Sequence, residues 1–167
     1  IAVLFGVPLG VLASLSKNKV TQHSIMAITL TGYSIPVFWL GLTLSLWFGV
    51  ELGWLPVSGR INLLYEIEPV TGFMLIDTLL SDSIYRVSAF KDAVFHIILP
   101  SITLAVLPFT VVVRITRAAM LTIMEQPYIK AAEARGLHTG TIVLRHALPN
   151  ALIPVLKNMG LKLGTFA

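Results

Sequence analysis

The fold is decided by one uninterrupted apolar run, IMAITLTGYSIPVFWLGLTLSLWFGV, at Ile25–Val50. Its 26 residues include no Asp, Glu, Lys, Arg or His. At 1.5 Å per residue, a helix of this length reaches roughly 39 Å, which is enough to cross a bilayer with some tilt. Because backbone N–H and C=O groups find no water in the bilayer core, the run predicts a membrane-spanning helix.

The composition of the whole chain is typical of an integral membrane protein. Hydrophobic residues make up 56% of the 167 residues and charged residues only 12%, against roughly 25% charged in soluble domains. Four apolar segments predict an all-α, polytopic transmembrane helical bundle that forms one domain over 1–167. These membrane segments are 1–15, 25–50, 97–117 and 151–167. Because the chain begins and ends inside apolar runs, we expect it to be an internal fragment of a longer protein.

Charges between the apolar segments predict how the chain crosses the membrane. The segments 16–24 and 114–150 carry seven Lys and Arg residues, whereas 51–96 carries three, together with six acidic residues. Since Lys and Arg are enriched on the cytoplasmic side, we expect 16–24 and 118–150 in the cytoplasm and 51–96 outside. The formal net charge of +4 is explained by these basic flanks, so a nucleic-acid partner is not expected.

The second apolar run contains a proline preceded by hydroxyl side chains. Pro36 has no N–H to donate to the carbonyl of Gly32, so a kink or a loosened turn is predicted there. Thr31, Tyr33, Ser34 and Pro36 are therefore candidates for a translocation path through the membrane. The alternative is that the hydroxyls satisfy freed backbone groups in a packed bundle.

Two shorter patterns predict local packing. The run 71–80 is apolar but too short to cross a bilayer, and it predicts a short helix lying on the surface or packed within segment 51–96. Two Gly-x3-Gly pairs, Gly6 with Gly10 and Gly160 with Gly164, permit close contact between helices. Generic helix packing is the interpretation we favour for both pairs.

The basic segment 118–150 contains a helical pattern of its own. The run from Lys130 to Arg135 suits a helix because Ala and Arg are strong helix formers. Gly136 supplies the left-handed position that commonly ends a helix. A second helix is predicted to start near Thr139 or Thr141 and to stop before Leu148–Pro149. Spacing alone leaves open an ordinary amphipathic helix at the membrane surface.

This segment resembles the motif Glu-Ala-Ala-x3-Gly-x9-Ile-x-Leu-Pro of ABC-importer permeases. Five of its seven fixed positions match, and the seven are Lys130, Ala131, Ala132, Gly136, His146, Leu148 and Pro149. The departures, Lys130 and His146, are typical of the peptide/nickel branch of this family. The segments 32–41, 52–56 and 70–77 also resemble that branch, so the similarity covers nearly the whole chain.

The resemblance implies a B-type permease subunit of a dipeptide, oligopeptide, glutathione or nickel importer, forming the membrane path for a small solute. It also implies a cytoplasmic coupling helix between two spans and a bacterial or archaeal inner-membrane location. The implied partners are a second permease subunit, two ATPase subunits that bind ATP-Mg, an extracytoplasmic solute-binding protein and membrane lipid. The implied coupling residues are Tyr128, Lys130, Ala131, Ala132, Glu133, Ala134, Arg135, Gly136, Leu137, His146, Leu148 and Pro149.

Several kinds of chemistry are not expected from this sequence. It contains no cysteine, no Gly-x4-Gly-Lys-Ser/Thr phosphate loop and no His-Glu-x-x-His motif, so we expect no nucleotide, metal or other cofactor bound by the chain and no catalytic residues. The main alternative function is an ion-gradient-driven secondary transporter or channel without an ATPase partner. The uncharged run 25–50 counts against a proton-coupled carrier. A membrane enzyme and a structural anchor are further alternatives.

Overall fold

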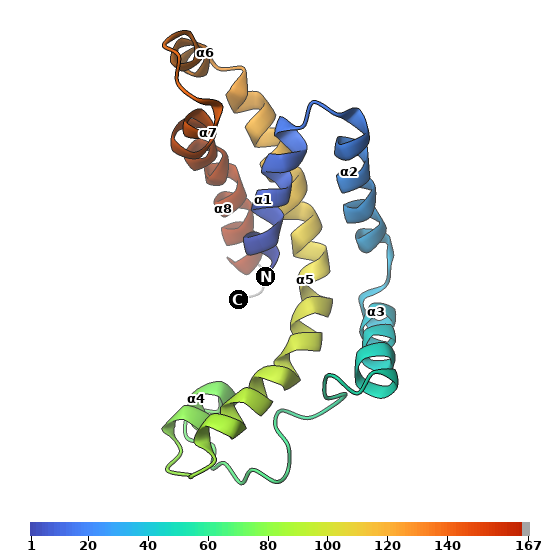
Figure 1. Ribbon diagram of the computed structural model, residues 1–167. Coiled ribbons are helices and arrows are strands. Elements are labelled where there is room, and N and C mark those ends of the chain that lie inside the picture. Colours follow the sequence, from blue (N-terminus) through green and yellow to red (C-terminus); the bar gives the residue numbers. More distant parts are fainter. Residues whose placement is uncertain (165–167) are drawn as a thin grey trace. The chain divides into compact units, whose positions relative to one another are not determined.

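The computed structural model describes residues 1–164, and every regular element in that part of the chain is a helix (Figure 1). The helices form two compact units, one of Ile1–Ser34 with Val106–Ala167 and one of Ile35–Ala105. Helix α5 (Arg86–Met124) contributes residues to both units. Residues 165–167, the end of the predicted segment 151–167, lie outside the described part of the chain.

Each unit has its own set of helices. The first unit contains residues 106–124 of α5 and the helices α1 (Ala2–Leu15), α2 (Lys19–Ser34), α6 (Pro127–Ala134), α7 (Thr139–Thr141), the π-helix η2 (Ile142–Ala147) and α8 (Leu148–Gly164). The second unit contains residues 86–105 of α5 and the helices α3 (Val37–Leu44), the π-helix η1 (Ser45–Glu51) and α4 (Met74–Leu80).

Helix length and apolarity agree with a membrane protein. Within the described residues, α5 is the one helix that is long and apolar enough to cross a bilayer by itself, with 39 residues. The stretches Lys19–Ser34 and Val37–Glu51 pass the same test when they are counted together as one interrupted span. Helix α1 is apolar but shorter, with 14 residues. The assignment of the four predicted segments to membrane spans stays a prediction.

The run 25–50 is interrupted at the predicted place, but the interruption is a complete break and not only the predicted kink or loosened turn. Helix α2 ends at Ser34 and α3 begins at Val37, with Pro36 in an extended conformation (φ −58°, ψ 130°). Pro36 lacks the N–H of a regular turn, and its ring pushes the preceding Ile35 away from helical dihedral angles. Ile35 and Pro36 therefore both disfavour helical backbone between α2 and α3.

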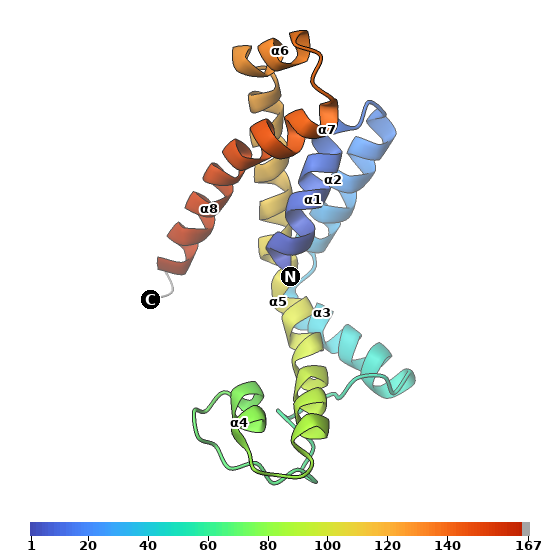
Figure 2. The same cartoon turned by 60° about the vertical axis from the view of Figure 1, so that its left-hand side comes forward.

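Helix α1 lies alongside residues 106–124 of α5, as both views show (Figure 1 and Figure 2). The contact passes through Gly6 and Gly10, which are both buried. A Cβ atom on Gly6 would lie 2.8 Å from Val112 Cγ1. One on Gly10 would lie 2.6 Å from Thr116 Cβ and 2.8 Å from the Val113 carbonyl oxygen. The backbones approach so closely that glycine is required, which supports the packing interpretation of this pair.

Helix α2 is held to α5 by polar side chains. The Thr110 hydroxyl on α5 donates to the Thr29 carbonyl oxygen on α2 at 2.8 Å, and both threonines are buried. Closer to the start of α2, Arg117 Nη2 donates to Gln22 Oε1 at 3.4 Å. Hydrogen bonds of this kind fix neighbouring helices where apolar burial alone provides little drive for association.

The segment 51–96 contains the predicted short helix, which begins at Met74 because the preceding residues form a turn around Asp77. The buried Asp77 carboxylate accepts hydrogen bonds from the Thr71 hydroxyl (2.6 Å), the Thr71 N–H (2.7 Å) and the Gly72 N–H (3.1 Å). The Thr71 hydroxyl is the main cause that lowers the pKa of Asp77 from its ordinary value of 3.8, against a smaller opposing effect of burial. The ionised Asp77 carboxylate therefore stabilises the folded state fully at pH values above the ordinary pKa. This stabilisation is lost as the pH falls through the lowered pKa.

The close approach of α1 to α5 gives a test. Gly10→Ala is expected to destabilise the protein by about 1–3 kcal/mol, because the new methyl group meets a backbone oxygen that cannot turn aside as a side chain can. Gly160→Ala is the matched control, since nothing lies within 4 Å of a Cβ at that position of α8, and Ala favours the helix. The surroundings of Gly164, its partner in the predicted pair, lie outside the described side chains. Denaturant unfolding of the full-length protein in detergent measures both variants, and equal midpoints would contradict the packing.

Candidate functional site

The basic segment after α5 folds into α6, at the place where the sequence predicts a helix. Gln126 precedes it in an extended conformation (φ −68°, ψ 145°), and its carbonyl oxygen accepts from the N–H groups of Ile129 (3.0 Å) and Lys130 (3.2 Å). Pro127 occupies the first turn, where an N–H has no partner within the helix and its absence costs little. The predicted place of Pro127 is confirmed.

Helix α6 ends in a Schellman motif built on Gly136. The Gly136 N–H donates to the Glu133 carbonyl oxygen at 2.9 Å, and the Leu137 N–H donates to the Ala132 carbonyl oxygen at 3.3 Å. This pair of bonds requires a left-handed residue between them, and Gly136 has φ +76°. Nothing lies within 4 Å of a Cβ at this position, so its conformation, and not lack of space, calls for glycine. The predicted helix end is confirmed.

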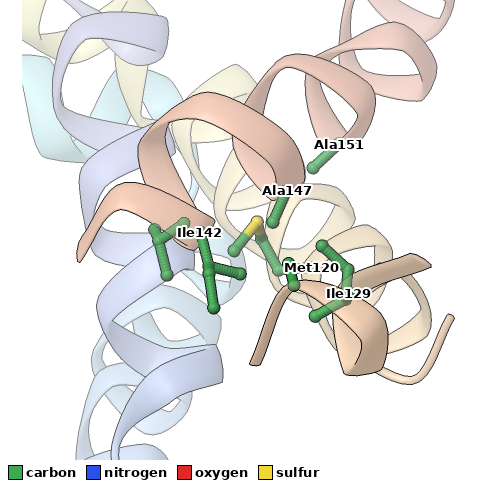
Figure 3. Packing of buried hydrophobic residues seen from close by; sticks show 7 residues of the cluster. Met120, Ile129, Ile142, Ala147 and Ala151 are labelled. Atoms are coloured by element: carbon green, nitrogen blue, oxygen red, sulfur yellow. The ribbon is translucent and has the colours of Figure 1, made fainter. Parts of the chain in front are cut away.

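One face of α6 is buried against the chain's own helices (Figure 3). Ile129 is fully buried and Ala132 is 2% exposed. They join a hydrophobic cluster around Met120 of α5 whose other members are Ile142, Val143, Ala147 and Ala151. Ala132 is therefore a packing residue in this chain, and its burial does not fit the predicted contact of this side chain with a partner.

The opposite face of α6 is exposed and combines small with charged side chains. We call it the α6 exposed face, and it consists of Tyr128, Lys130, Ala131, Glu133 and Ala134 of the helix together with Arg135 and Leu137, which follow its last residue. Ala131 and Ala134 offer little bulk, so another protein surface could approach the helix backbone closely there. Charged residues of both signs surround them, as is common where polar groups encircle the centre of an interface.

The next helix begins with a cap that the sequence does not reveal. The helix starts at Thr139, as predicted, but neither Thr139 nor Thr141 is its N-cap, because His138 takes that position in an extended conformation. Its Nδ1 accepts a hydrogen bond from the Gly140 N–H at 3.1 Å. A ring nitrogen thus satisfies a free N–H of the first turn, which is the role that a Ser, Thr, Asp or Asn oxygen ordinarily has.

Leu148 and Pro149 do not stop this helix, contrary to the prediction. The elements α7, η2 and α8 follow one another without a gap from Thr139 to Gly164. In the π-helix η2 each hydrogen bond reaches one residue further, and the Leu148 N–H donates to the Val143 carbonyl oxygen. Pro149 consequently falls in the first turn of α8, directly after this π-helical turn, where its missing N–H is tolerated.

A hydrogen bond joins α6 to the start of α8. Asn150 Nδ2 donates to Tyr128 Oη at 3.3 Å and to the His146 carbonyl oxygen at 2.8 Å. His146 and Leu148 are half-buried, and Pro149 is exposed. The structure therefore brings the two halves of the predicted coupling segment together. Sequence reasoning missed Asn150, because nothing in the sequence indicates a contact with a side chain 22 residues earlier.

Two candidate path residues in α2 donate their hydroxyl hydrogen bonds within the helix itself. The Thr31 and Ser34 hydroxyls each donate to the carbonyl four residues earlier, at 2.9 Å and 3.1 Å. These bonds favour the alternative in which the hydroxyls satisfy backbone groups. Tyr33 and Pro36 are exposed, and their place along a translocation path stays a prediction.

The described residues show no cluster of three or more His, Asp or Glu side chains that could hold a metal ion. In three of the four histidines, Nδ1 is hydrogen-bonded to a nearby backbone group. His23 lies 2.6 Å from the Lys19 carbonyl oxygen, His96 lies 2.8 Å from the Asp92 carbonyl oxygen, and His138 caps α7.

Residues 6–167 match the protein family described as "Binding-protein-dependent transport system inner membrane component". The chain belongs to this family. It is 52% identical over 161 residues to the di/tripeptide transport system permease protein DppB of Pseudomonas aeruginosa. It is 49% identical over 164 residues to the putrescine export system permease protein SapB of Escherichia coli K12, and 41% identical over 167 residues to the dipeptide transport system permease protein DppB of the same strain.

The chain spans about half the length of the curated relatives it matches. The three alignments cover 96%, 98% and 98% of this chain, but 47%, 51% and 48% of the relatives. Membership of the family confirms the predicted resemblance and the predicted all-α permease fold. By this membership the chain is part of the inner-membrane component of a binding-protein-dependent transport system.

The Schellman motif of the permease gives a second test. Gly136→Ala is expected to cost about 1–2 kcal/mol locally, because an L-residue with a Cβ is strained at this positive φ. Amide exchange of Leu137, whose N–H belongs to the motif, should become roughly 5–30 times faster in the full-length permease. Gly136→Asn is the control, since asparagine tolerates the left-handed conformation better and should lose less protection. Unchanged exchange in the Ala variant would contradict the role assigned to Gly136.

Proposed function

We propose that the permease forms part of the membrane path of an ABC importer for small peptides and is coupled to ATPase subunits through residues 128–149. The observation that carries this proposal is the two-sided character of α6. On one side of the helix, Ile129 and Ala132 are buried in the permease's own core. On the other side, Ala131 and Ala134 are exposed. A transport system that depends on a binding protein needs such a connection between its membrane component and an energy source.

The packing around Met120 explains how a movement of α6 would reach the membrane helices. Ile129 contacts a cluster with members on α5, η2 and α8, and Tyr128 is hydrogen-bonded to Asn150 at the start of α8. Closely packed interiors are hardly compressible. A push on the α6 exposed face therefore moves the ends of α5 and α8 with it, and such a movement would open the path to one side of the membrane and then to the other.

Charge distribution supports the orientation that this coupling requires. The basic segments 16–24 and 118–150 would lie in the cytoplasm, where ATP is available, and the acidic segment 51–96 would lie outside. Two ATPase subunits carrying ATP-Mg would then meet α6, a solute-binding protein would approach from the opposite side, and a second permease subunit would complete the path. Membrane lipid would surround the apolar helices.

The names of the relatives guide the choice of solute. DppB of Pseudomonas aeruginosa, at 52% identity, is named as a di/tripeptide permease, and small peptides are accordingly our first candidate. SapB of Escherichia coli K12, at 49% identity, is named for putrescine export, so a diamine is the second. The alternative mechanism, an ion-gradient-driven transporter or channel without an ATPase partner, leaves the α6 exposed face without a function.

Crosslinking tests the coupling. With Ala134→Cys in the full-length permease and a cysteine in the surface groove of the cognate ATPase, we expect a disulfide crosslink whose yield changes when ATP is added. Leu63→Cys is the matched control, because this side chain is 96% exposed and lies in the segment proposed to face outward. It should react with added thiol reagents but not with the ATPase.

Absence of a nucleotide-sensitive crosslink at Ala134, at Ala131 and at Arg135 would contradict the docking of α6. Uptake by vesicles that contain the complete transporter separates the two mechanisms. Peptide uptake that requires ATP supports the proposal, whereas uptake driven by an ion gradient after ATP depletion supports the alternative.

A further inference from the structure

The second unit contains a pocket that the coupling proposal does not use. Its volume is about 340 Å³, and it lies between α3 and η1, the turn 56–59 and α5. The polar side chains in its lining are Ser45, Ser58, His96 and Thr103, and the Thr103 hydroxyl is already bonded to the carbonyl of Leu99 at 2.9 Å. The lining residues include no Lys or Arg. The question is therefore what His96 and the two serines could bind.

The partner of Nδ1 determines which nitrogen of a neutral His96 ring carries the proton. Its side chain is 7% exposed, and Nδ1 lies 2.8 Å from the Asp92 carbonyl oxygen and 3.4 Å from Asp92 Oδ2. A carbonyl oxygen can only accept a hydrogen bond, so Nδ1 carries the proton and donates it. In the neutral ring Nε2 is then an acceptor. This hydrogen bond to the Asp92 carbonyl oxygen holds the ring in its orientation, while the Asp92 carboxylate accepts from the Asn62 N–H at 2.6 Å.

The pocket that His96 lines contains further acceptors. The turn at Gly59 covers the imidazole, since a Cβ at Gly59 would lie 3.9 Å from Nε2. Pro100 in the next turn of α5 has no N–H to donate to the His96 carbonyl oxygen, so that oxygen lacks its usual helical partner. The hydroxyls of Ser45 and Ser58 can also accept. Because these groups accept hydrogen bonds and no Lys or Arg lines the pocket to repel a positive charge, the pocket favours a cation that donates hydrogen bonds.

We propose that this pocket binds the primary ammonium group of the transported solute, with His96 Nε2 accepting one of its N–H bonds. An ammonium group has three donors and no acceptor, which matches the acceptors of the polar lining residues, while the remaining lining residues are apolar or glycine. Small peptides and putrescine both carry such a group, so the inference rests on the proposed function and names the chemical feature that its two candidate solutes share. His96 is thereby a binding residue of the permease itself, in addition to any selection by a solute-binding protein.

Equilibrium binding to the full-length permease in its complete transporter tests the site. The probes are Ala-Ala, N-acetyl-Ala-Ala, which lacks the ammonium group, and putrescine. The wild type should prefer Ala-Ala and putrescine to the acetylated peptide. In His96→Phe, which keeps a ring but removes the acceptor, affinity for Ala-Ala should fall roughly tenfold or more, as expected for a lost hydrogen bond to a charged group. The preference over N-acetyl-Ala-Ala should disappear with it.

Three further variants separate binding from folding. His96→Gln restores an acceptor oxygen and should recover part of the affinity, whereas His23→Phe, at an exposed histidine outside the pocket, should change nothing. If His96→Phe does not assemble, Ser45→Ala is the second measurement and should weaken Ala-Ala binding roughly threefold or more. Equal binding of Ala-Ala and N-acetyl-Ala-Ala by the wild type, or unchanged affinity in the assembled variants, overturns the site.

Measurements on the complete transporter distinguish a failure of this site from a failure of the proposed function. ATP-driven uptake of Ala-Ala without any dependence on the ammonium group or on His96 overturns the site and leaves the importer proposal standing. Binding that depends on His96 without ATP-driven uptake supports the site and contradicts the coupling.

Discussion

The burial of Ile129 and Ala132 against Met120 is the contact on which the proposed coupling site depends. Helix α6 has eight residues, and isolated helices shorter than about 12–15 residues are only marginally stable in water. Burial of a side chain such as Ile129 contributes about 1.5–3 kcal/mol. The helix therefore exists in this form because the permease core holds it, and its exposed face can be displaced only together with that core.

Features that rest on local backbone chemistry could be predicted from the sequence. Gly136 ends α6 because few other residues accept its positive φ, and Pro127 opens the helix because the first turn needs no N–H from it. The apolar run 25–50 and the centre of α5, predicted as 97–117, follow from hydropathy, and the spacing from Ala131 to Pro149 was enough to indicate the family. In each case the cause lies within a few residues of the effect or in a fixed offset along the chain. The ends of α5, which reach Arg86 and Met124, extend into segments predicted as loops.

Features that depend on contacts between distant residues could not be predicted. Pro149 continues a helix because the π-helical turn η2 precedes it, which no propensity indicates. The Thr110 hydroxyl satisfies a carbonyl 81 residues away, and Asn150 reaches Tyr128 across the gap between α8 and α6. The buried face of Ala132 was missed for the same reason, since the three alanines of α6 look alike until the neighbouring helices are in place. The role proposed for His96 likewise depends on distant residues, because Ser45 and the segment 56–59 form the pocket beside it.

The central claim is that the core around Met120 ties the exposed face of α6 to α5 and α8. The most direct measurement is the amount of solute transported per ATP hydrolysed, in proteoliposomes that contain the complete transporter. Ile129→Ala leaves the exposed face unchanged but loosens its attachment by about 2–5 kcal/mol, and Ile129→Val does so by about 0.5–1.5 kcal/mol. The account predicts that ATP hydrolysis continues while the transport ratio falls in the order wild type, Val, Ala. An unchanged ratio in both variants would contradict it.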